Sequence, residues 1–353
     1  MSWLGIYTWQ SIRISEHVET DFLILGYGFT ARYAAYELSK RFPDKKIMIT
    51  ARKEDFTADY SKRDDYIFLR YGKEGTIRQL LEELGVLCKG SWHNSKRVKI
   101  GFVKEGKIIR EVSGKVKQDY YEKVFDGSTP AEKLKGNIKY FYDSQRMINA
   151  KFSELMSALD NKIKDRATFI AGEIESINAD YHKVRLSDTT EVSYKVLIST
   201  IPLDVFLRKL IPPNLEIIGI LHTQLLYYYP AQYTRMHGYD QLYVLDKEDN
   251  VLRFIKTEGS IIKETLESSD KEPIMTEPYG KLMINKDKAE REPYKESMVN
   301  KVNNLNSLVL DSFFVKLARQ QVYLAGRVAR WQSYHYLEDN IKDVLEIVQN
   351  LNF

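Results

Sequence analysis

The chain has 353 residues, of which 43% are hydrophobic and 29% are charged, a balance typical of folded globular proteins. The 53 basic and 49 acidic residues leave a net charge of only +4, which argues against a nucleic-acid-binding surface. No apolar run approaches the roughly 20 residues that span a bilayer. The single cysteine, Cys88, excludes an intramolecular disulfide and a thiolate metal cluster.

The first part of the chain predicts a β-α-β unit. Residues 22–25 (FLIL) form an apolar run of strand length, residues 30–42 have the spacing of a helix packed on a sheet, and residues 46–50 (KIMIT) predict a second strand. The first 20 residues lack the basic start and the apolar centre of a secretory signal, and we expect a cytoplasmic protein. A chain of this length also exceeds one hydrophobic core, so two domains are expected.

The pattern Gly26-x-Gly28-x-x-Ala31 lies between the first strand and the helix, where a phosphate-binding turn belongs. Gly26 permits the tight turn, Gly28 lets the backbone approach a pyrophosphate, and Ala31 is small enough for close packing of helix on strand. The N–H groups of the helix start, which includes Phe29 and Thr30, then face the phosphates. A Rossmann-like unit that binds no ligand is the alternative.

The second strand ends without the acidic residue that commonly binds the ribose hydroxyls. Thr50 stands there, followed by Ala51 and Arg52. Thr50 can still hydrogen-bond a ribose, and Arg52 can stack on adenine or meet a phosphate. This departure weakens the case for plain NAD and leaves NADP open, because an arginine suits a 2′-phosphate.

Several elements are predicted after this unit, and Pro202 is expected to stop the last strand of the series. They are a helix at 75–86 ending at Gly85, a hairpin at 97–114 turning at Glu105-Gly106, an amphipathic helix at 147–163, and an antiparallel excursion from 167 that returns to a buried strand at 196–200.

The character of the sequence changes over residues 205–310. Aromatic-rich strands are predicted at 219–230 and 240–259, with a turn at Asp249-Asn250 in the second. Residues 256–301 are rich in charges and contain three prolines, which favours surface loops and short helices.

The C-terminal stretch at 322–348 predicts a buried strand that ends in Gly326-Arg327, followed by the aromatic Trp331 and a helix that starts with acidic residues. This arrangement resembles the closing FAD motif of the UDP-galactopyranose mutase, amine oxidase and protoporphyrinogen oxidase superfamily. In that superfamily the flavin lies along the N-terminus of the final helix. The resemblance therefore assigns Gly326, Arg327, Trp331 and Asp339 to the cofactor.

Three more segments are similar to motifs of the same superfamily, in the same order. Residues 21–31 resemble its first motif, residues 195–202 resemble its strand ending in Ser-Thr-x-Pro, with Thr200, and residues 167–177 resemble the strand whose backbone lies near adenine, at about Ile174. The resemblance implies an α/β fold with a Rossmann-like FAD/NAD(P)-binding domain and an inserted, sheet-based substrate domain. The expected division is 18–85, 141–205 and 311–353 for the discontinuous FAD-binding domain, and 86–140 and 206–310 for the substrate domain.

Flavin enzymes need few catalytic side chains because the cofactor carries the reaction. Tyr228 is a candidate because alternate residues of a strand face opposite ways, so one or two of the three tyrosines at 227–229 can line a pocket; packing within a sheet is the alternative. His335, between two tyrosines, is a candidate acid or base, with a solvated loop residue as the alternative.

Arg253 is the candidate for binding an anionic group of the substrate, since a similar strand carries an arginine into the substrate cavity in the mutase-like branch. The alternative interpretation is that Arg253 lies on the solvated face of its strand. Alternation predicts that Leu252 and Phe254 face away from the side of Arg253 and Val251. A pairing of Arg253 with Arg32 or Arg70 would favour a pyrophosphate.

The sequence and the resemblance together predict an FAD-binding, oxidoreductase-like flavoprotein that acts on a small organic substrate. The reaction is either an amine-oxidase-like oxidation or a mutase-like redox-neutral reaction on a nucleotide sugar. Two alternatives stay open: a non-catalytic protein that keeps the fold, and an NADP-dependent reductase. No metal site, nucleic-acid partner or membrane span is expected, and the oligomeric state is left open.

Overall fold

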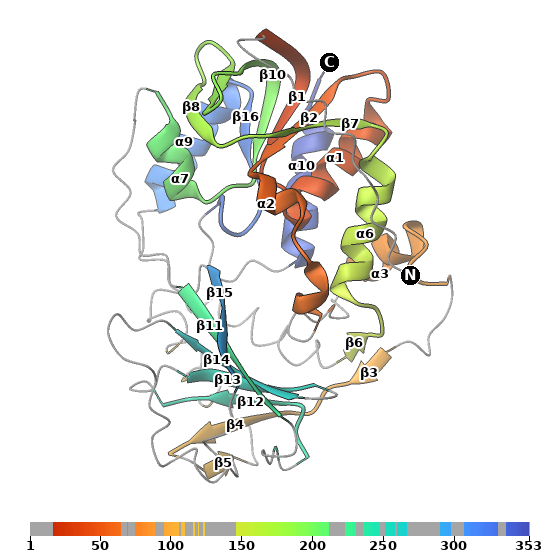
Figure 1. The fold of residues 1–353 in the computed structure, drawn as a ribbon, viewed down its shortest axis with the longest axis vertical. Coiled ribbons are helices and arrows are strands. Elements are labelled where there is room, and N and C mark those ends of the chain that lie inside the picture. Colours follow the sequence, from red (N-terminus) through yellow and green to blue (C-terminus); the bar gives the residue numbers. More distant parts are fainter. Residues whose placement is uncertain are drawn as a thin grey trace.

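Two seven-stranded sheets organise the fold (Figure 1). The computed structural model describes residues 17–64, 69, 75–88, 95–105, 107–109, 116, 119, 123, 146–211, 223–230, 236, 238–246, 251–257, 260–266, 290–297, 307–330 and 337–352. The first sheet is mainly parallel and is covered by helices on both faces, and the second is mainly antiparallel. The predicted α/β fold class, a Rossmann-like unit with a second, sheet-based part, is confirmed.

The first sheet has the strand order β7-β2-β1-β10-β9-β8, and β16 also pairs with β10. The strands β7, β2, β1, β10 and β16 run parallel, whereas β9 and β8 run antiparallel to their neighbours. Their bounds are β1 (His17–Leu25), β2 (Ile47–Ala51), β7 (Ala167–Ala171), β8 (Ile174–Asn178), β9 (Lys183–Leu186), β10 (Glu191–Ser199) and β16 (Val322–Leu324).

The segment from 167 was predicted to be antiparallel, but its first strand is parallel to its neighbour. Its first piece divides into β7, which is parallel to β2, and β8, which is antiparallel to β9. The division follows Gly172, whose N–H still donates to the Ala51 carbonyl of β2 at 2.9 Å. The return to a buried strand is confirmed in β10, and Pro202 is the N-cap of the next helix, α7 (Leu203–Lys209).

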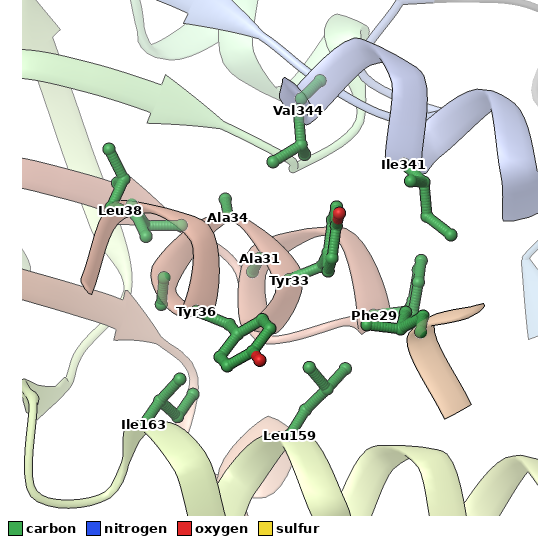
Figure 2. Close-up of a cluster of buried hydrophobic side chains, with 14 of the residues drawn as sticks. Phe29, Ala31, Tyr33, Ala34, Tyr36, Leu38, Leu159, Ile163, Ile341 and Val344 are labelled. Atoms are coloured by element: carbon green, nitrogen blue, oxygen red, sulfur yellow. The ribbon is translucent and has the colours of Figure 1, made fainter. Parts of the chain in front are cut away.

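Helix α1 lies between two other helices on one face of this sheet. Leu159 and Ile163 of α6 reach it from one side, and Ile341 and Val344 of α10 reach it from the other (Figure 2). Alanines on α1 are fully buried, which lets the helix approach the sheet closely. The bounds are α1 (Phe29–Arg41), α3 (Thr76–Glu83), α6 (Phe152–Ile163) and α10 (Leu337–Asn350) on this face, with α7 and α9 (Ser307–Arg319) packed against the other.

Helix α6 starts later than predicted. Residues 147–148 belong to the strand β6 (Arg146–Ile148), which pairs with β3 (Ser95–Arg97). The helix begins at Phe152, and Asp64 accepts hydrogen bonds from the Ser153 N–H at 2.8 Å and from its hydroxyl at 2.6 Å. A carboxylate from a remote segment, which a local pattern does not reveal, therefore satisfies the start of this helix.

The second sheet has the strand order β15-β11-β14-β13-β12-β4-β5. Its pairings are antiparallel except for β12 with β4. The bounds are β4 (Ile100–Lys104), β5 (Lys107–Ile109), β11 (Thr223–Pro230), β12 (Gln241–Val244), β13 (Val251–Lys256), β14 (Ser260–Leu266) and β15 (Glu290–Ser297). The strands β4 and β5 confirm the predicted hairpin, whereas the predicted turn at 249–250 lies outside the described residues.

The prediction of loops and short helices over 256–301 is wrong for β14 and β15. In β14, Ile261 and Ile262 are buried, and the buried carboxylate of Glu264 is paired with Arg253. Strand β15 contains Pro293 and lies at the edge of the sheet, where a missing N–H donor is tolerated. The charged residues and the proline led to the prediction of loops. In β14 the charge of Glu264 is paired with Arg253, and in β15 the proline is tolerated because the strand lies at the edge of the sheet.

Candidate functional site

The carboxyl ends of the parallel strands meet at one edge of the first sheet. In the register, Leu25 of β1 stands beside Thr50 of β2 and beside Ser199 of β10. Ser199 in turn stands beside Leu324 of β16. Ligands of open α/β sheets bind at this edge. Five of the residues predicted to bind cofactor gather here from separate segments, namely Gly26, Thr30, Thr50, Thr200 and Gly326.

Gly26 makes the turn that leaves β1. Its φ of 101° lies in the region that favours glycine, and its N–H donates to the Thr50 carbonyl at 2.9 Å. A Cβ on Gly26 would stand 2.5 Å from Oγ1 of Thr200. The Thr200 hydroxyl donates to the Leu25 carbonyl at 2.8 Å, so Thr200 supports the turn from β10.

Gly28 is the N-cap of α1 and has ordinary extended backbone, with φ −76° and ψ −173°. A Cβ on Gly28 would meet nothing within 4 Å, and no side chain caps the helix. Within the described part of the chain, the space beside Gly28 at the start of α1 is therefore open, as a phosphate-binding turn requires. Phe29 and Ala31 are buried in the core, so only their backbone is available to a ligand.

Two buried hydroxyls flank the turn. Thr50 and Ser199 are fully buried, and neither hydroxyl has a hydrogen-bond partner within the part of the chain that the structure describes. An unpaired buried polar group costs about 1–3 kcal/mol, so such groups usually meet a water or a ligand. The open space at Gly28 and these two hydroxyls fit a ligand that carries phosphates and polar substituents.

A buried ion pair lies behind the turn. Arg32 of α1 is only 1% exposed, and its Nε and Nη2 donate to the two carboxylate oxygens of Asp160 in α6, at 2.6 and 3.2 Å. Its Nη1 donates to the carbonyl of Tyr27 and, at 3.1 Å, to the hydroxyl of Tyr60. Burial alone lowers the pKa of Arg32, but the hydrogen bonds and charge of Asp160 outweigh burial and raise it.

The residue between the two glycines, Tyr27, is held in several ways. The Arg32 guanidinium lies 3.5 Å from the centroid of its ring, and its hydroxyl donates to Asp160 at 2.6 Å. Its ring also packs against Phe56 and Phe169, with centroids 4.6 and 5.7 Å away. The sequence analysis missed this arrangement, although an arginine within the small and apolar residues of α1 indicates a buried carboxylate partner.

Arg52 follows β2 and is the N-cap of the short helix α2 (Lys53–Phe56). Its side chain is 55% exposed and donates to the two oxygens of Asp55 at 3.0 and 3.1 Å, with Glu54 3.3 Å away. The hydrogen bond that Arg52 donates to Asp55 raises the pKa of Arg52, as do the charges of the nearby carboxylates. Arg52 thus lies at the predicted place, but two carboxylates already surround its charge.

The turn after β16 is anchored by α10. Gly326 has φ 95°, and a Cβ there would stand 2.9 Å from Oγ1 of Thr30, so this turn packs directly on the start of α1. The Gly326 N–H donates to Asp343 at 3.2 Å, and the Arg327 N–H donates to Asn340 at 3.2 Å. Neither acceptor was predicted from the sequence.

The other predicted cofactor residues are more scattered. Asp339 is half-buried in the first turn of α10. Ile174 begins β8, three residues after the last contact of β7 with β2, and its side chain packs against the core on the sheet face that α7 and α9 cover. Trp331 and the candidate acid or base His335 lie outside the described residues. Their assignments stay predictions.

The second sheet carries Arg253 on β13. Its Nε donates to Glu264 and its Nη1 donates to the Tyr243 hydroxyl at 3.4 Å, and its side chain is 17% exposed. Arg253 is therefore largely covered by its neighbours, and its role toward a substrate stays a prediction. Tyr228 lies on β11 between β14 and β15, where it pairs with Ile262 and Glu290 through the backbone.

One expectation about Arg253 is wrong. The register of β13 shifts between Val251 and Arg253, so Val251 and Phe254 pack in the same core cluster instead of on opposite faces. A bulge of this kind breaks simple alternation. A pairing of Arg253 with Arg32 has no support in the structure, where Arg32 pairs with Asp160. Arg70 lies outside the described residues.

The described ranges lack a metal site and a membrane-spanning helix. In those ranges, no group of three or more His, Cys, Asp and Glu side chains is placed to hold a metal ion. No helix there combines the length and the apolar character needed to cross a membrane. Cys88, the single cysteine, is exposed.

Comparison with solved structures finds this fold in proteins of low sequence identity. A reduced UDP-galactopyranose mutase superposes with a TM-score of 0.65 at 14% identity, over 93% of this chain and 93% of that chain. A CLA-producing fatty acid isomerase from P. acnes gives 0.65 at 12% identity, over 95% and 99%. A putrescine oxidase redesigned in its cofactor binding gives 0.59 at 10% identity, over 95% and 99%.

These likenesses extend over both sheets, since almost all of each chain is covered. The chain shares the fold of these solved structures, which confirms the fold that the sequence motifs implied. No protein-family model matches the sequence, and no curated protein matches it by sequence.

Proposed function

We propose that this chain is an FAD-binding, oxidoreductase-like flavoprotein that acts on a small organic substrate. The observation that carries the proposal is the turn at Gly28, at the carboxyl edge of the parallel sheet, where no side chain caps α1 and a Cβ would meet no atom of the described residues within 4 Å. When bound, FAD supplies the redox chemistry, and the protein supplies orientation and electrostatics.

The proposed roles follow from position along the sheet edge. The α1 start binds the pyrophosphate through backbone N–H groups, and the buried hydroxyls of Thr50 and Ser199 face polar groups of the dinucleotide. The turn at Gly326-Arg327 and the start of α10 hold the flavin end. We assign residues 18–85, 141–205 and 311–353 to the FAD-binding domain and 86–140 and 206–310 to the substrate domain.

The reaction belongs to one of two classes. Two of the similar structures are named a mutase and an isomerase, which are names for reactions without net oxidation, and a third is named an oxidase. On the second sheet, Arg253 is the proposed anion-binding residue, with Tyr228 and His335 as further candidates. The charge of Arg253 is offset by Glu264, which favours a weakly charged or hydrogen-bonding substrate group over a diphosphate.

The NADP-dependent alternative has less support. A 2′-phosphate needs an available cation at the end of β2, and the charge of Arg52 is already shared between Asp55 and Glu54. Those carboxylates would also oppose a further negative group. A non-catalytic protein that keeps the fold is distinguished from the proposal by its failure to bind FAD.

The test is the Gly28→Val variant. Its backbone is compatible with any residue and a Cβ meets no atom within 4 Å, so we expect it to fold but to block the approach of the pyrophosphate. Purified G28V should lose bound flavin, measured by absorbance and by FAD titration of the apoprotein. The matched control is Lys151→Val, which places valine at the N-cap of α6, also in extended backbone.

The control should lose a similar amount of stability and keep its FAD. Wild-type FAD binding by G28V would refute the placement of the phosphates. Equal loss of FAD in both variants would mean that general destabilisation, and not the blocked turn, is responsible.

A further inference from the structure

A buried arginine next to a phosphate-binding turn needs an explanation. Arg32 is fully buried, and removing a guanidinium from water is costly unless its donors are satisfied. An apolar residue of similar size would fill the same space without this cost. The contacts of Arg32 show what the charge adds, because they converge on Tyr27, the residue between the two glycines.

We propose that Arg32 is a positioning residue that sets the direction of the Gly28 N–H toward the cofactor phosphates. It does so by holding the carbonyl of Tyr27, together with Tyr60. The inference rests on the proposed function, because it assigns a role at the same turn.

The geometry follows from the peptide bond. The Tyr27 carbonyl and the Gly28 N–H belong to one planar, trans peptide, so they point in opposite directions. Arg32 Nη1 and the Tyr60 hydroxyl, the latter at 3.3 Å, both donate to that carbonyl and draw it toward the protein interior. The Gly28 N–H is thereby directed away from the ion pair, to the side on which the first turn of α1 is open.

Arg32 is itself held by groups far away in the sequence. Asp160 of α6 engages it at two atoms, and Asp160 also accepts from the Tyr27 hydroxyl. Tyr60 belongs to the turn of 3-10 helix at Tyr60–Arg63, and its ring packs against Phe152 at the start of α6, with centroids 6.0 Å apart. Both supports of the Tyr27 carbonyl therefore connect to α6, which makes that helix the base of the turn.

The decisive variant is the double substitution Arg32→Met with Asp160→Leu. Replacing a buried ion pair by apolar residues of similar volume is often neutral for stability, whereas removing one partner strands a buried charge. The double variant should therefore be more stable than R32M or D160L alone. Its dissociation constant for FAD, titrated into the apoprotein, should still rise at least about tenfold, the scale of a lost charge-assisted hydrogen bond.

If Arg32 had only a structural role, the double variant would regain its affinity for FAD together with its stability. The matched control is Arg78→Met, which removes one partner of the half-buried Arg78–Glu82 pair of α3 at 2.8 Å and should leave FAD affinity unchanged. Tyr60→Phe is a milder second variant that removes one donor to the Tyr27 carbonyl. It should weaken FAD binding about twofold to tenfold, and it decides the matter if the double variant fails to fold.

A crystal structure of the double variant without cofactor separates this inference from the proposed function. A turned peptide between residues 27 and 28 supports the role of Arg32 even if the wild-type chain proves not to bind FAD. A retained peptide orientation, or wild-type FAD affinity in both R32M/D160L and Y60F, would overturn it.

Discussion

Gly26 and Gly28 stand two residues apart, yet the structure requires glycine only at Gly26. Gly26 has a backbone conformation that other residues rarely adopt, and a Cβ there would meet Thr200 at 2.5 Å. Gly28 has neither restriction, so the fold does not require glycine there, and we propose that a bound ligand does. Gly26→Ala should therefore lower the free energy of unfolding by about 1–3 kcal/mol, measured by urea denaturation. Gly28→Ala is the comparison and should change it by much less; equal losses would contradict this division of roles.

The local pattern predicted these two glycines, because each role depends on a few adjacent residues. The contacts that hold the turn were not predictable in the same way. Asp160 and Tyr60 reach Tyr27 from segments far away in the chain, and the sequence alone does not say which helix will lie behind α1. Arg253 illustrates the same limit, because a single shift in strand register reversed the expected side of Val251.

At the scale of elements, α6 depends on the segment that follows β2. Asp64 accepts from the N–H and the hydroxyl of Ser153 and so caps the start of the helix from outside. Asp64→Ala should lower the free energy of unfolding by about 1 kcal/mol in urea denaturation, the usual value of a capping side chain. The control is Asp59→Ala, since Asp59 accepts from the N–H of Ser61 at an exposed 3-10 turn and supports no long helix. A loss in D59A as large as that in D64A would show that the capping of α6 has no special weight.

Elements with strong periodicity were predictable, and those stabilised by distant partners were not. The β-α-β unit and the final helix follow from apolar runs that each bury one surface. Strand β15 was missed because its sequence, EREPYKES, becomes a strand only by pairing with β11. The first strand, which begins at His17 instead of residue 22, was similarly extended by its pairing with β10.

At the scale of the whole molecule, we propose separate roles for the two sheets. The first would bind the cofactor at the edge that carries Gly26, Gly28 and Gly326, and the second would present the polar groups around Arg253 and Tyr243 to the substrate. The fold was predictable because four motifs occur along the chain in the order of a known superfamily. The substrate was not, because similar structures carry names of different reactions on this one fold.

The central claim, that this chain binds FAD, is tested most directly by identifying what the native protein carries. The protein is purified without added cofactor, denatured, and the released small molecules are identified and quantified by mass spectrometry and flavin fluorescence. The account predicts FAD in an amount close to equimolar with the chain. Recovery of a nicotinamide dinucleotide in its place, or of no dinucleotide together with an apoprotein that takes up no FAD on titration, would contradict it.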